Sequence, residues 1–298
     1  MRRRFVTLDV FTAKRFTGNP LAVVLEAEGL ETPVMQAVAR EFNLPETVFV
    51  LPPEEPKHRA KLRIFTPARE LPFAGHPTVG TAVLLGCRDG GNGPLELVLE
   101  EKVGPVSCTV EPRGDSGRAR FFLPREPERI GIVEDAAKIV AALGLTLDDL
   151  GCEDFVPENW TAGNPITFVP VRGLDAIARA RPDTARWDEG FGPDDPQIAY
   201  LFCAQTSEPG HSYHARMFAP AYGVAEDPAT GSAAAAFAGL IAASGRRGDG
   251  EHTITIEQGY EMGRPSLMQL DITLRAGALT SAAIGGDAVI VSEGTIEA

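Results

Sequence analysis

Two motifs occur twice along this chain, in the same order in each half, and this internal repeat is the strongest constraint on its fold. The stretch FTGNPLAVVL places Gly-Asn-Pro before an apolar strand, and TAGNPITFVPV repeats it with Asn164 standing 145 residues after Asn19. In RIFTPARELPFAGHPTVGTA and in ARMFAPAYGVAEDPATGSAAAA, a strand and a proline-bearing loop lead through Gly75 or Gly231 into a helix. Surface loops absorb small differences in spacing. The shared order of both motifs therefore indicates a duplicated domain.

Both glycine-led helices are apolar on nearly every side, at residues 77–85 and 233–241. A helix without a polar face must be enclosed by protein, and the segments around these two are typical of short strands. We therefore predict an α+β fold of two pseudo-symmetric domains, each a barrel-like, mostly antiparallel sheet around a central helix. The predicted halves are 1–125 and 130–284, and the final strand, 285–298, could return to the first half.

The charge balance narrows the class of partner. The chain has 41 acidic and 28 basic residues, a net charge of −13. This argues against nucleic acid and anionic membranes as partners, because both require a basic surface. The start of the chain alternates like a strand rather than forming the apolar core of a signal peptide, and no apolar run reaches the ~18 residues of a membrane span. Four well-separated cysteines fit reduced thiols, so we expect a cytoplasmic protein.

The two predicted helix starts are suited to binding an anion. A helix start carries backbone N–H groups without intrahelical partners and the positive end of the helix dipole. Gly75 and Gly231 would let a ligand approach the backbone closely, Pro77 suits the first helical position, and Ser232 suits the helix cap. If the halves face each other, these starts would form a cleft that binds a carboxylate substrate.

Three side chains near these features could handle protons. His76 stands at the first helix start, where the dipole favours the neutral imidazole. Asp227 precedes Ser232 by five residues, and Glu46 stands directly before the apolar strand 48–50, where partial desolvation suits a general acid/base. Each also has an ordinary structural interpretation, as a helix cap, a turn former and a solvated strand end, respectively. The repeat favours the catalytic interpretation, because it puts His76 and Asp227 at matching ends of duplicated elements.

Other polar motifs are assigned structural roles. His211 and His214 could be metal ligands, but a spacing of three on a strand predicts opposite faces, and no third ligand is evident. The Gly-Gly-Asn-Gly stretch at 90–93 is predicted to be a tight turn. Asn19 and Asn164 are expected to brace the turns before their prolines, and either could also touch substrate.

Four of these motifs together resemble the PhzF family of phenazine-biosynthesis isomerases, which is close in fold to diaminopimelate epimerase. They are DVFTAKRFTGNPLAVV, LPETVFV, RIFTPARELPFAGHPTVGTA and EDPATGSAAAA, and the resemblance runs over essentially the whole chain. It implies two pseudo-symmetric halves with the active site between them, usually a homodimer, and neither cofactor nor metal. The substrate it implies is a small, cyclic carboxylate.

The resemblance also assigns roles to individual residues. Glu46 matches the glutamate that takes a proton from one substrate carbon and returns one at another. His76 and Asp227 match the family's other catalytic residues. The substrate-binding positions that it implies, together with the asparagine considered above, are Gly75, Gly231, Ser232 and Asn19.

Two alternative functions remain open from the sequence. Epimerases and racemases of the related fold use two cysteines, each directly before the glycine of a helix start. Ala74 and Thr230 occupy those positions here, and neither side chain ionises near neutral pH. Stereoinversion would therefore have to proceed without thiols. The other alternative is a protein that binds a small carboxylate without catalysis.

Overall fold

The computed structural model describes residues 2–90 and 93–298, and the chain divides into two compact units. The first unit comprises Met1–Pro124 with Ala283–Ala298, and the second comprises Arg125–Ala282. The predicted tight turn at 90–93 includes residues 91 and 92, which lie outside the described residues. Within the described part of the chain, no helix is both long enough and apolar enough to cross a membrane.

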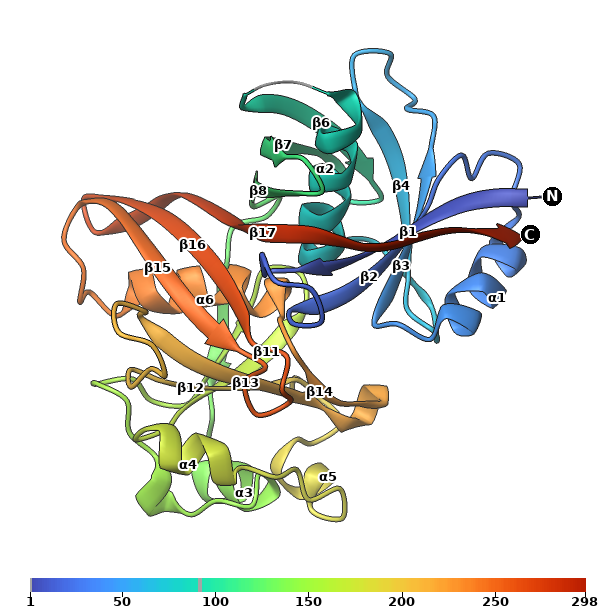
Figure 1. Ribbon diagram of the computed structural model, residues 1–298. Helices are drawn as coiled ribbons and strands as arrows, with labels where there is room; N and C mark the ends of the chain where they lie inside the picture. The colour runs from blue at the N-terminus through green and yellow to red at the C-terminus, as the bar shows by residue number, and fades with distance from the viewer. Residues whose placement is uncertain (1, 91–92) are drawn as a thin grey trace. The chain divides into compact units, whose positions relative to one another are not determined.

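The first unit is a closed barrel of strands (Figure 1). Its strands are β1 (Arg2–Val10), β2 (Asn19–Val24), β3 (Glu46–Leu51), β4 (Ala60–Phe65), β5 (Glu70–Leu71), β6 (Leu95–Glu101), β7 (Gly104–Arg113), β8 (Ser116–Phe122) and the part of β17 (Ala278–Glu297) that starts at Ala283. The circuit runs β17–β1–β2–β3–β4–β6–β7–β8 and back to β17, and β5 pairs with β4 outside it. The pairs β2–β3 and β4–β6 are parallel, whereas the others are antiparallel.

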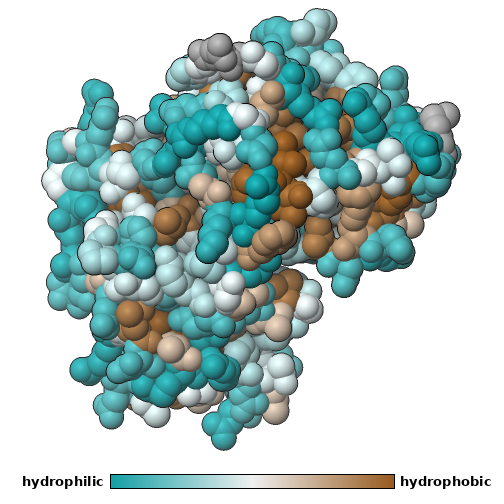
Figure 2. Space-filling view, in the orientation of Figure 1, coloured by the Kyte–Doolittle hydropathy of each residue, from teal (hydrophilic) through white to brown (hydrophobic). Residues whose placement is uncertain are grey.

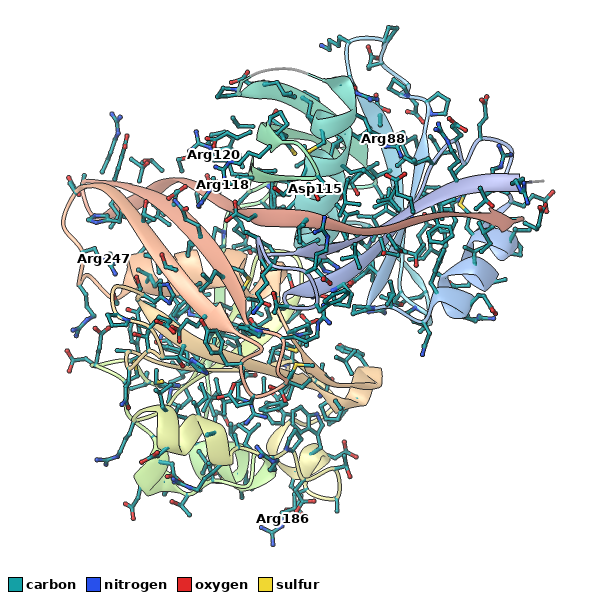
Figure 3. The ribbon with its side chains drawn as sticks, in the orientation of Figure 1. Arg88, Asp115, Arg118, Arg120, Arg186 and Arg247 are labelled. Carbon is teal, nitrogen blue, oxygen red and sulfur yellow. The ribbon has the colours of Figure 1, made fainter. Side chains whose placement is uncertain are left out.

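Helix α2 (Gly75–Asp89) runs inside this barrel and is buried continuously from Gly75 to Gly86. The barrel strands alternate accordingly: Ala119 and Phe121 of β8 are buried, while Arg118 and Arg120 extend away from the barrel (Figure 3). Close packing leaves little room along the helix, since a Cβ at Gly80 would lie 2.6 Å from a methyl group of Leu21. The apolar sequence of the helix is thus explained by its enclosure.

Helix α1 (Thr32–Phe42) packs on the outside of the same barrel. Its buried side chains, Met35, Val38 and Ala39, join a cluster with Phe49 and Phe65 of β3 and β4. The helix is therefore amphipathic, in contrast to α2.

The second unit is a mixed sheet around a second apolar helix. Its strands are β9 (Glu128–Ile132), β10 (Glu158–Thr161), β11 (Pro165–Pro170), β12 (Ala199–Cys203), β13 (Tyr213–Ala219), β14 (Val224–Asp227), β15 (Gly250–Gln258) and β16 (Ser266–Arg275). The pairing order is β9–β10–β11–β12–β13–β15–β16, with β14 also paired to β13. The pairs β11–β12 and β13–β15 are parallel.

Helix α6 (Gly231–Ala243) packs against β9, β10, β11 and β16 and is buried from Ala233 to Ile241. Gly239 marks its closest approach to other elements, since a Cβ there would lie 2.6 Å from the ring of Trp160. The short helices α3 (Ala136–Ala142), α4 (Leu174–Arg179) and α5 (Trp187–Gly190) form a separate apolar cluster against the other side of β11 and β12. Two 3-10 turns complete the unit, η1 (Leu147–Asp149) and η2 (Pro220–Tyr222).

The two units share one topology. The parallel pair β2–β3 corresponds to β11–β12, the parallel pair β4–β6 corresponds to β13–β15, and α2 corresponds to α6. Each unit therefore builds a mostly antiparallel sheet around one apolar helix, with its parallel neighbours at the same places. This confirms the predicted α+β class and the pseudo-symmetric, helix-centred architecture.

A third repeated feature is a turn that precedes an equivalent strand in each unit. Glu-Pro-Lys-His (55–58) lies before β4, and Glu-Pro-Gly-His (208–211) lies before β13. Glu100 accepts hydrogen bonds from the backbone N–H groups of Glu54 and Glu55, at 2.7 and 2.8 Å, and contacts His58. Glu257 accepts equivalent bonds from Ser207 and Glu208, both at 2.8 Å, and contacts His211. The duplication therefore extends to individual anchoring side chains.

The face of the molecule in Figure 2 is mainly hydrophilic, with apolar patches scattered among polar side chains. The large apolar residues that are exposed come from many different elements, including Phe16, Phe122, Ile130, Leu147 and Met262. Such scattered residues are normal for a protein surface.

Candidate functional site

Glu46 and His76 are the two predicted site residues that the first unit brings together. Oε2 of Glu46 lies 3.2 Å from Nδ1 of His76, and both side chains are largely buried. The parallel pairing of β2 and β3 sets Glu46 opposite Leu21, two residues after Asn19. Both strands thus begin at one edge of the barrel, where α2 also begins. This geometry explains why the Gly-Asn-Pro motif, the glutamate and the histidine meet.

Burial controls the charge of His76. It lowers the pKa of the imidazole to about 3, and a contact with the backbone of Pro20 opposes this shift only in part. The predicted neutral imidazole is therefore supported, although burial is the cause that the structure identifies. Nε2 of the ring is buried and has no hydrogen-bond partner among the described residues. A buried polar atom without a partner calls for an explanation, and a hydrogen bond to a ligand would provide one.

The start of α2 differs in detail from the prediction. The helix begins at Gly75, and its N-cap is Ala74, which has extended backbone angles and no side-chain cap. His76 is therefore the second helical residue rather than a cap, and Pro77 is the third rather than the first. Both shifts have the same cause, because Gly75 itself adopts the helical conformation. Gly75 is buried, and Asn19 is fully buried at the first position of β2.

Asp227 ends β14 in the second unit and is held by the residues that start α6. Its Oδ2 accepts a hydrogen bond from the Thr230 hydroxyl at 2.6 Å, and its backbone carbonyl accepts one from Nε2 of Gln258 at 2.7 Å. The carboxylate is only partly buried. This arrangement orients a carboxylate beside a helix start while leaving part of it accessible.

Gly231 and Ser232 also lie at this helix start, with one correction. The helix begins at Gly231 and its N-cap is Thr230, so Ser232 is the second helical residue and not the predicted cap. Gly231 is buried, and Ser232 is partly exposed. The correction parallels the one in the first unit, since in both cases the glycine is already helical.

Several buried polar residues near the predicted site were not found by sequence reasoning. The hydroxyl of Tyr200, on β12, is fully buried and has no hydrogen-bond partner among the described residues. Burial, with a smaller contribution from Asp227, raises the pKa of this phenol. Glu101 and Gln258 end the equivalent strands β6 and β15 and contact threonines of the two central helix starts. The sequence signal for Glu101 and Gln258 was the glutamate directly before each of them, Glu100 and Glu257, which binds the repeated turn.

The interpretation of His211 and His214 needs correction. The strand rule predicted opposite faces, but β13 begins only at Tyr213, and His211 lies in the preceding turn. Both histidines contact Glu257, with Nδ1 atoms 2.7 Å from its carboxylate oxygens. In the described chain, no trio of His, Cys, Asp or Glu side chains is placed to hold a metal ion.

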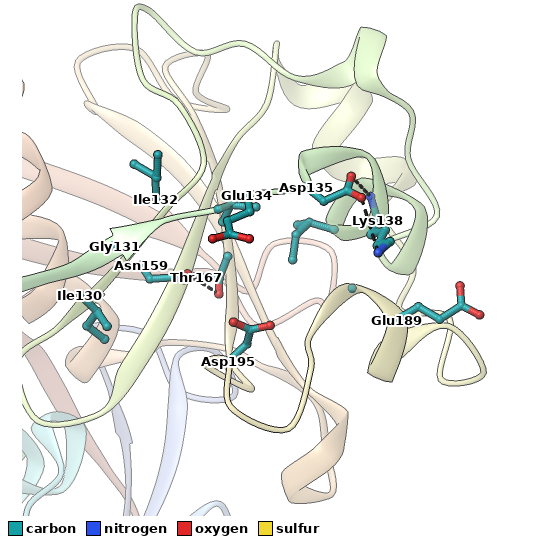
Figure 4. A pocket seen from close by; sticks show the side chains of 13 residues that line it. Ile130, Gly131, Ile132, Glu134, Asp135, Lys138, Asn159, Thr167, Glu189 and Asp195 are labelled. Carbon is teal, nitrogen blue, oxygen red and sulfur yellow. Dashed lines mark hydrogen bonds and ion pairs between the residues drawn. The ribbon is translucent and has the colours of Figure 1, made fainter.

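Two surface pockets lie apart from the predicted residues. One, of about 350 Å³ in the second unit, is bordered by the carboxylates Glu134, Asp135, Glu189 and Asp195 and by Lys138 (Figure 4). A carboxylate substrate would be repelled by this acidic lining. The other, of about 710 Å³ in the first unit, is bordered by charged side chains of both signs, Glu101 among them. Neither pocket is lined by Glu46, His76 or Asp227.

The four cysteines of the chain all lie outside the two helix starts. Ala74 and Thr230 are the N-cap residues of α2 and α6, the positions that a two-cysteine racemase would need for its acid and base. Cys108, Cys152 and Cys203 are buried, and burial raises the pKa of each thiol. A mechanism with two opposed thiols at the helix starts is therefore not built into this chain.

Comparison with known proteins identifies one family over nearly the whole chain. The model of a family described as phenazine biosynthesis-like protein matches residues 8–294. An uncharacterised isomerase of Mesorhizobium japonicum is 47% identical, over 99% of this chain and 98% of that protein. The trans-2,3-dihydro-3-hydroxyanthranilate isomerase of Pseudomonas fluorescens is 36% identical, over 98% of each chain.

Solved structures agree with this family assignment. A Bacillus anthracis phenazine biosynthesis protein of the PhzF family matches with a TM-score of 0.88 and 27% identity, and the match covers 100% of both chains. A hydroxyproline epimerase from Agrobacterium vitis matches with a TM-score of 0.63 at 13% identity, covering 99% of this chain and 91% of that one. The second similarity concerns the fold alone.

Proposed function

This chain belongs to the PhzC-PhzF family of phenazine biosynthesis-like proteins and is an isomerase, and we propose that it moves a proton between two carbons of a small carboxylate substrate with Glu46 as the acid/base. The observation that carries the proposal is the buried contact between Glu46 and His76, at 3.2 Å. The proposal also draws on the relatives, several of which are named as isomerases of trans-2,3-dihydro-3-hydroxyanthranilate.

In the proposed reaction, the carboxylate of Glu46 removes a proton from one carbon of the substrate. The electron pair of the broken C–H bond forms a new double bond, and the existing double bond moves along the ring. Glu46 then returns a proton to a different carbon. Atoms and electrons balance without an external oxidant, reductant or cofactor, since the product is an isomer of the substrate. Partial burial of the carboxylate supports this role, because a desolvated carboxylate is a stronger base toward carbon.

His76 is proposed to orient Glu46 and to hydrogen-bond the substrate. A neutral imidazole has one N–H donor and one acceptor nitrogen. Nδ1 faces Glu46, the ring also hydrogen-bonds the backbone of Pro20, and Nε2 has no partner among the described residues. Nδ1 is therefore proposed to carry the hydrogen, and Nε2 to accept a hydrogen bond from the substrate. The low pKa of His76 supports this division, because a protonated ring would form a strong ion pair with Glu46 and weaken it as a base.

The other predicted residues have proposed roles within their own units. The N–H groups around Gly75 at the start of α2 suit a carboxylate, and those around Gly231 and Ser232 at the start of α6 are equally suited. Asp227 is proposed to orient groups or relay protons. Asn19, buried beside the same edge of the barrel as Glu46, is proposed to hold the backbone near His76. That Asp227 serves the same substrate as Glu46 stays a prediction, as do the homodimer and the cytoplasmic location.

Exchange of hydrogen for deuterium tests the chemistry directly. We expect the protein, incubated with trans-2,3-dihydro-3-hydroxyanthranilate in deuterated water, to give an isomerised product that carries deuterium at carbon. Glu46→Gln should lower kcat by about 10²–10⁴-fold, the range for loss of a general acid/base, while the fold is retained. Glu41→Gln on the exposed surface of α1 is the matched control and should keep full activity.

Other outcomes would separate the alternatives. Binding of the probe without exchange would identify a carboxylate-binding protein and overturn the proposal. Full activity of the Glu46→Gln variant would remove Glu46 from the mechanism. Stereoinversion of an amino acid in a chiral assay, with no isomerisation of the probe, would identify a thiol-independent epimerase or racemase and would also overturn the proposal.

A further inference from the structure

Glu101 is a buried acid that the proposed mechanism does not use. It is the last residue of β6, its exposed fraction is only 7%, and Oε2 has no hydrogen-bond partner among the described residues. Its Oε1 lies 2.7 Å from the hydroxyl oxygen of Thr78, the fourth residue of α2. The same hydroxyl oxygen lies 2.7 Å from the backbone carbonyl of Ala74, the N-cap residue. The side chain is therefore connected to the start of the central helix.

The number of hydrogens shared among these three oxygens depends on whether Glu101 is ionised or protonated. The Thr78 hydroxyl has one hydrogen, and the Ala74 carbonyl can only accept. If Glu101 is ionised, the single Thr78 hydrogen is shared between Glu101 and the Ala74 carbonyl. If Glu101 is a carboxylic acid, Thr78 can donate to Ala74 and accept from Glu101, so that each short contact has its own hydrogen. Burial favours the acid, because it raises the pKa of Glu101 to about 8, whereas donation from Thr78 to the carboxylate is a smaller effect in the opposite direction.

Gln258 occupies the equivalent place in the second unit. It is the last residue of β15, as Glu101 is of β6, and it is fully buried. Nε2 of Gln258 donates to the Thr230 hydroxyl at 2.9 Å and to the Asp227 carbonyl at 2.7 Å, and Oε1 accepts from the Thr230 N–H at 3.3 Å. Here too, a strand-end side chain is joined through a threonine hydroxyl to the N-cap residue of the central helix.

We propose that Glu101 and Gln258 are a pseudo-symmetric pair of neutral positioning residues, each of which holds the start of the central helix in its own unit. The proposal rests on the proposed function, because it assigns the helix starts to substrate binding. Neutrality is essential to the role of Glu101. An ionised carboxylate buried beside the first turn of α2 would occupy the positive end of the helix dipole and oppose an anionic substrate.

Three variants test this inference. Glu101→Gln keeps the shape and a neutral donor, so kcat and KM for trans-2,3-dihydro-3-hydroxyanthranilate should stay within about threefold of the wild type. Glu101→Ala removes the hydrogen bond to Thr78. The kcat should then fall by about 10–100-fold, which is the usual effect of losing a supporting hydrogen bond or of a small misplacement of the site. Gln258→Glu should be impaired like Glu101→Ala, because a carboxyl group cannot make all three hydrogen bonds of the amide.

The control is the neighbouring acid. Glu100 anchors a turn, and among the described residues none of its hydrogen bonds reaches α2, so Glu100→Gln should lower thermal stability while kcat is unchanged. If Glu101→Gln is as damaging as Glu101→Ala, or if Gln258→Glu is fully active, the inference is overturned.

Amide NMR separates this inference from the proposed function. In ¹⁵N-labelled protein without substrate, Glu101→Ala should shift the amide signals of Gly75 and His76, and Glu101→Gln should leave them in place. This result would support the positioning role even if the wild type failed to isomerise the probe, which would count against the proposed function alone. Unchanged Gly75 and His76 signals in Glu101→Ala would refute the positioning role whatever the activity.

Discussion

Nδ1 of His76 lies 3.2 Å from Oε2 of Glu46, although the two residues come from different elements of the barrel. The contact exists because β3 begins with Glu46 and α2 begins with Gly75 at the same edge. The imidazole is buried, so it remains neutral, and a neutral ring beside a carboxylate is suited to orienting a base without neutralising it.

The protonation of His76 predicts a pH effect on stability. The folded pKa, about 3, lies below the unfolded value of about 6.5. The unfolded state therefore binds more protons below pH 6.5, and the free energy of unfolding should fall by about 3 kcal/mol between pH 7 and pH 4.5 through this residue alone. In urea unfolding, the free energy of unfolding of His76→Gln should fall less over this pH range than that of the wild type. Replacement of the partly exposed His252 by Gln is the matched control variant and is measured in the same way.

Glu101 predicts a pH effect in the opposite direction. Its folded pKa, about 8, lies above the ordinary carboxyl value, so the folded state binds more protons between about pH 4.5 and pH 8. The stability contributed by this residue should fall as the pH rises through that window, by a few kcal/mol at most. Cys108, the other titratable group that interacts with it, has its pKa raised further and stays neutral.

Glu101→Gln should remove this alkaline loss of stability, because an amide does not ionise. Urea unfolding of the wild type and the variant at pH 6 and pH 8.5 measures the difference. If the free energy of unfolding changes equally between these two pH values in both proteins, Glu101 is already ionised at pH 6.

His214 is expected to be an imidazolium that holds together two carboxylates, Glu257 near the end of β15 and Glu261 in the turn that follows. Nδ1 and Nε2 lie 2.7 Å from Glu257 and 3.0 Å from Glu261, so both nitrogens must donate. Burial alone would lower the pKa of His214, but the hydrogen bonds and charges of Glu261 and Glu257 outweigh it and raise the pKa. His214→Gln should therefore lose about 3–5 kcal/mol of stability, as expected when a partner is removed from a buried ion pair.

The stability that is lost in His214→Gln should depend on pH. A raised histidine pKa stabilises the folded state fully below about pH 6.5, and the stabilisation disappears as the pH rises through the folded value. The difference in free energy of unfolding between the wild type and His214→Gln should thus be largest in mild acid. His211→Gln is the matched control and should cost less, since in the described part of the chain the His211 ring contacts one carboxylate, Glu257, and is more exposed. If this difference in free energy of unfolding increased with rising pH, the assignment of His214 as an imidazolium would be contradicted.

Gly239 tests the enclosure of α6. A Cβ at this position would lie 2.6 Å from the ring of Trp160 and 2.7 Å from Pro127. Gly239→Ala should destabilise the protein by about 1–3 kcal/mol, the usual cost of overpacking, despite the higher helix propensity of alanine. Gly248→Ala, at a site with open space around it, should change the melting temperature little. Thermal unfolding compares the two variants, and equal melting temperatures would argue against a tightly packed helix.

Much of the fold could be predicted because its signals are local and repeated. Helices without a polar face can be stable only inside protein, and two of them at matching places required two similar shells of strands. The start residues of those helices were harder to predict. A glycine that enters the helix is indistinguishable in sequence from one that precedes it, and Gly75 and Gly231 both entered.

Local sequence patterns were enough to predict the duplication, the helix-centred α+β architecture and the candidate site residues Glu46, His76 and Asp227. Which side chains meet, and what charge they carry, could be read only from the folded arrangement. Contacts such as His76 with Glu46, Glu101 with Thr78 and Gln258 with Thr230 join segments that are remote in sequence. Protonation in turn depends on burial, and burial depends on how every surrounding strand packs.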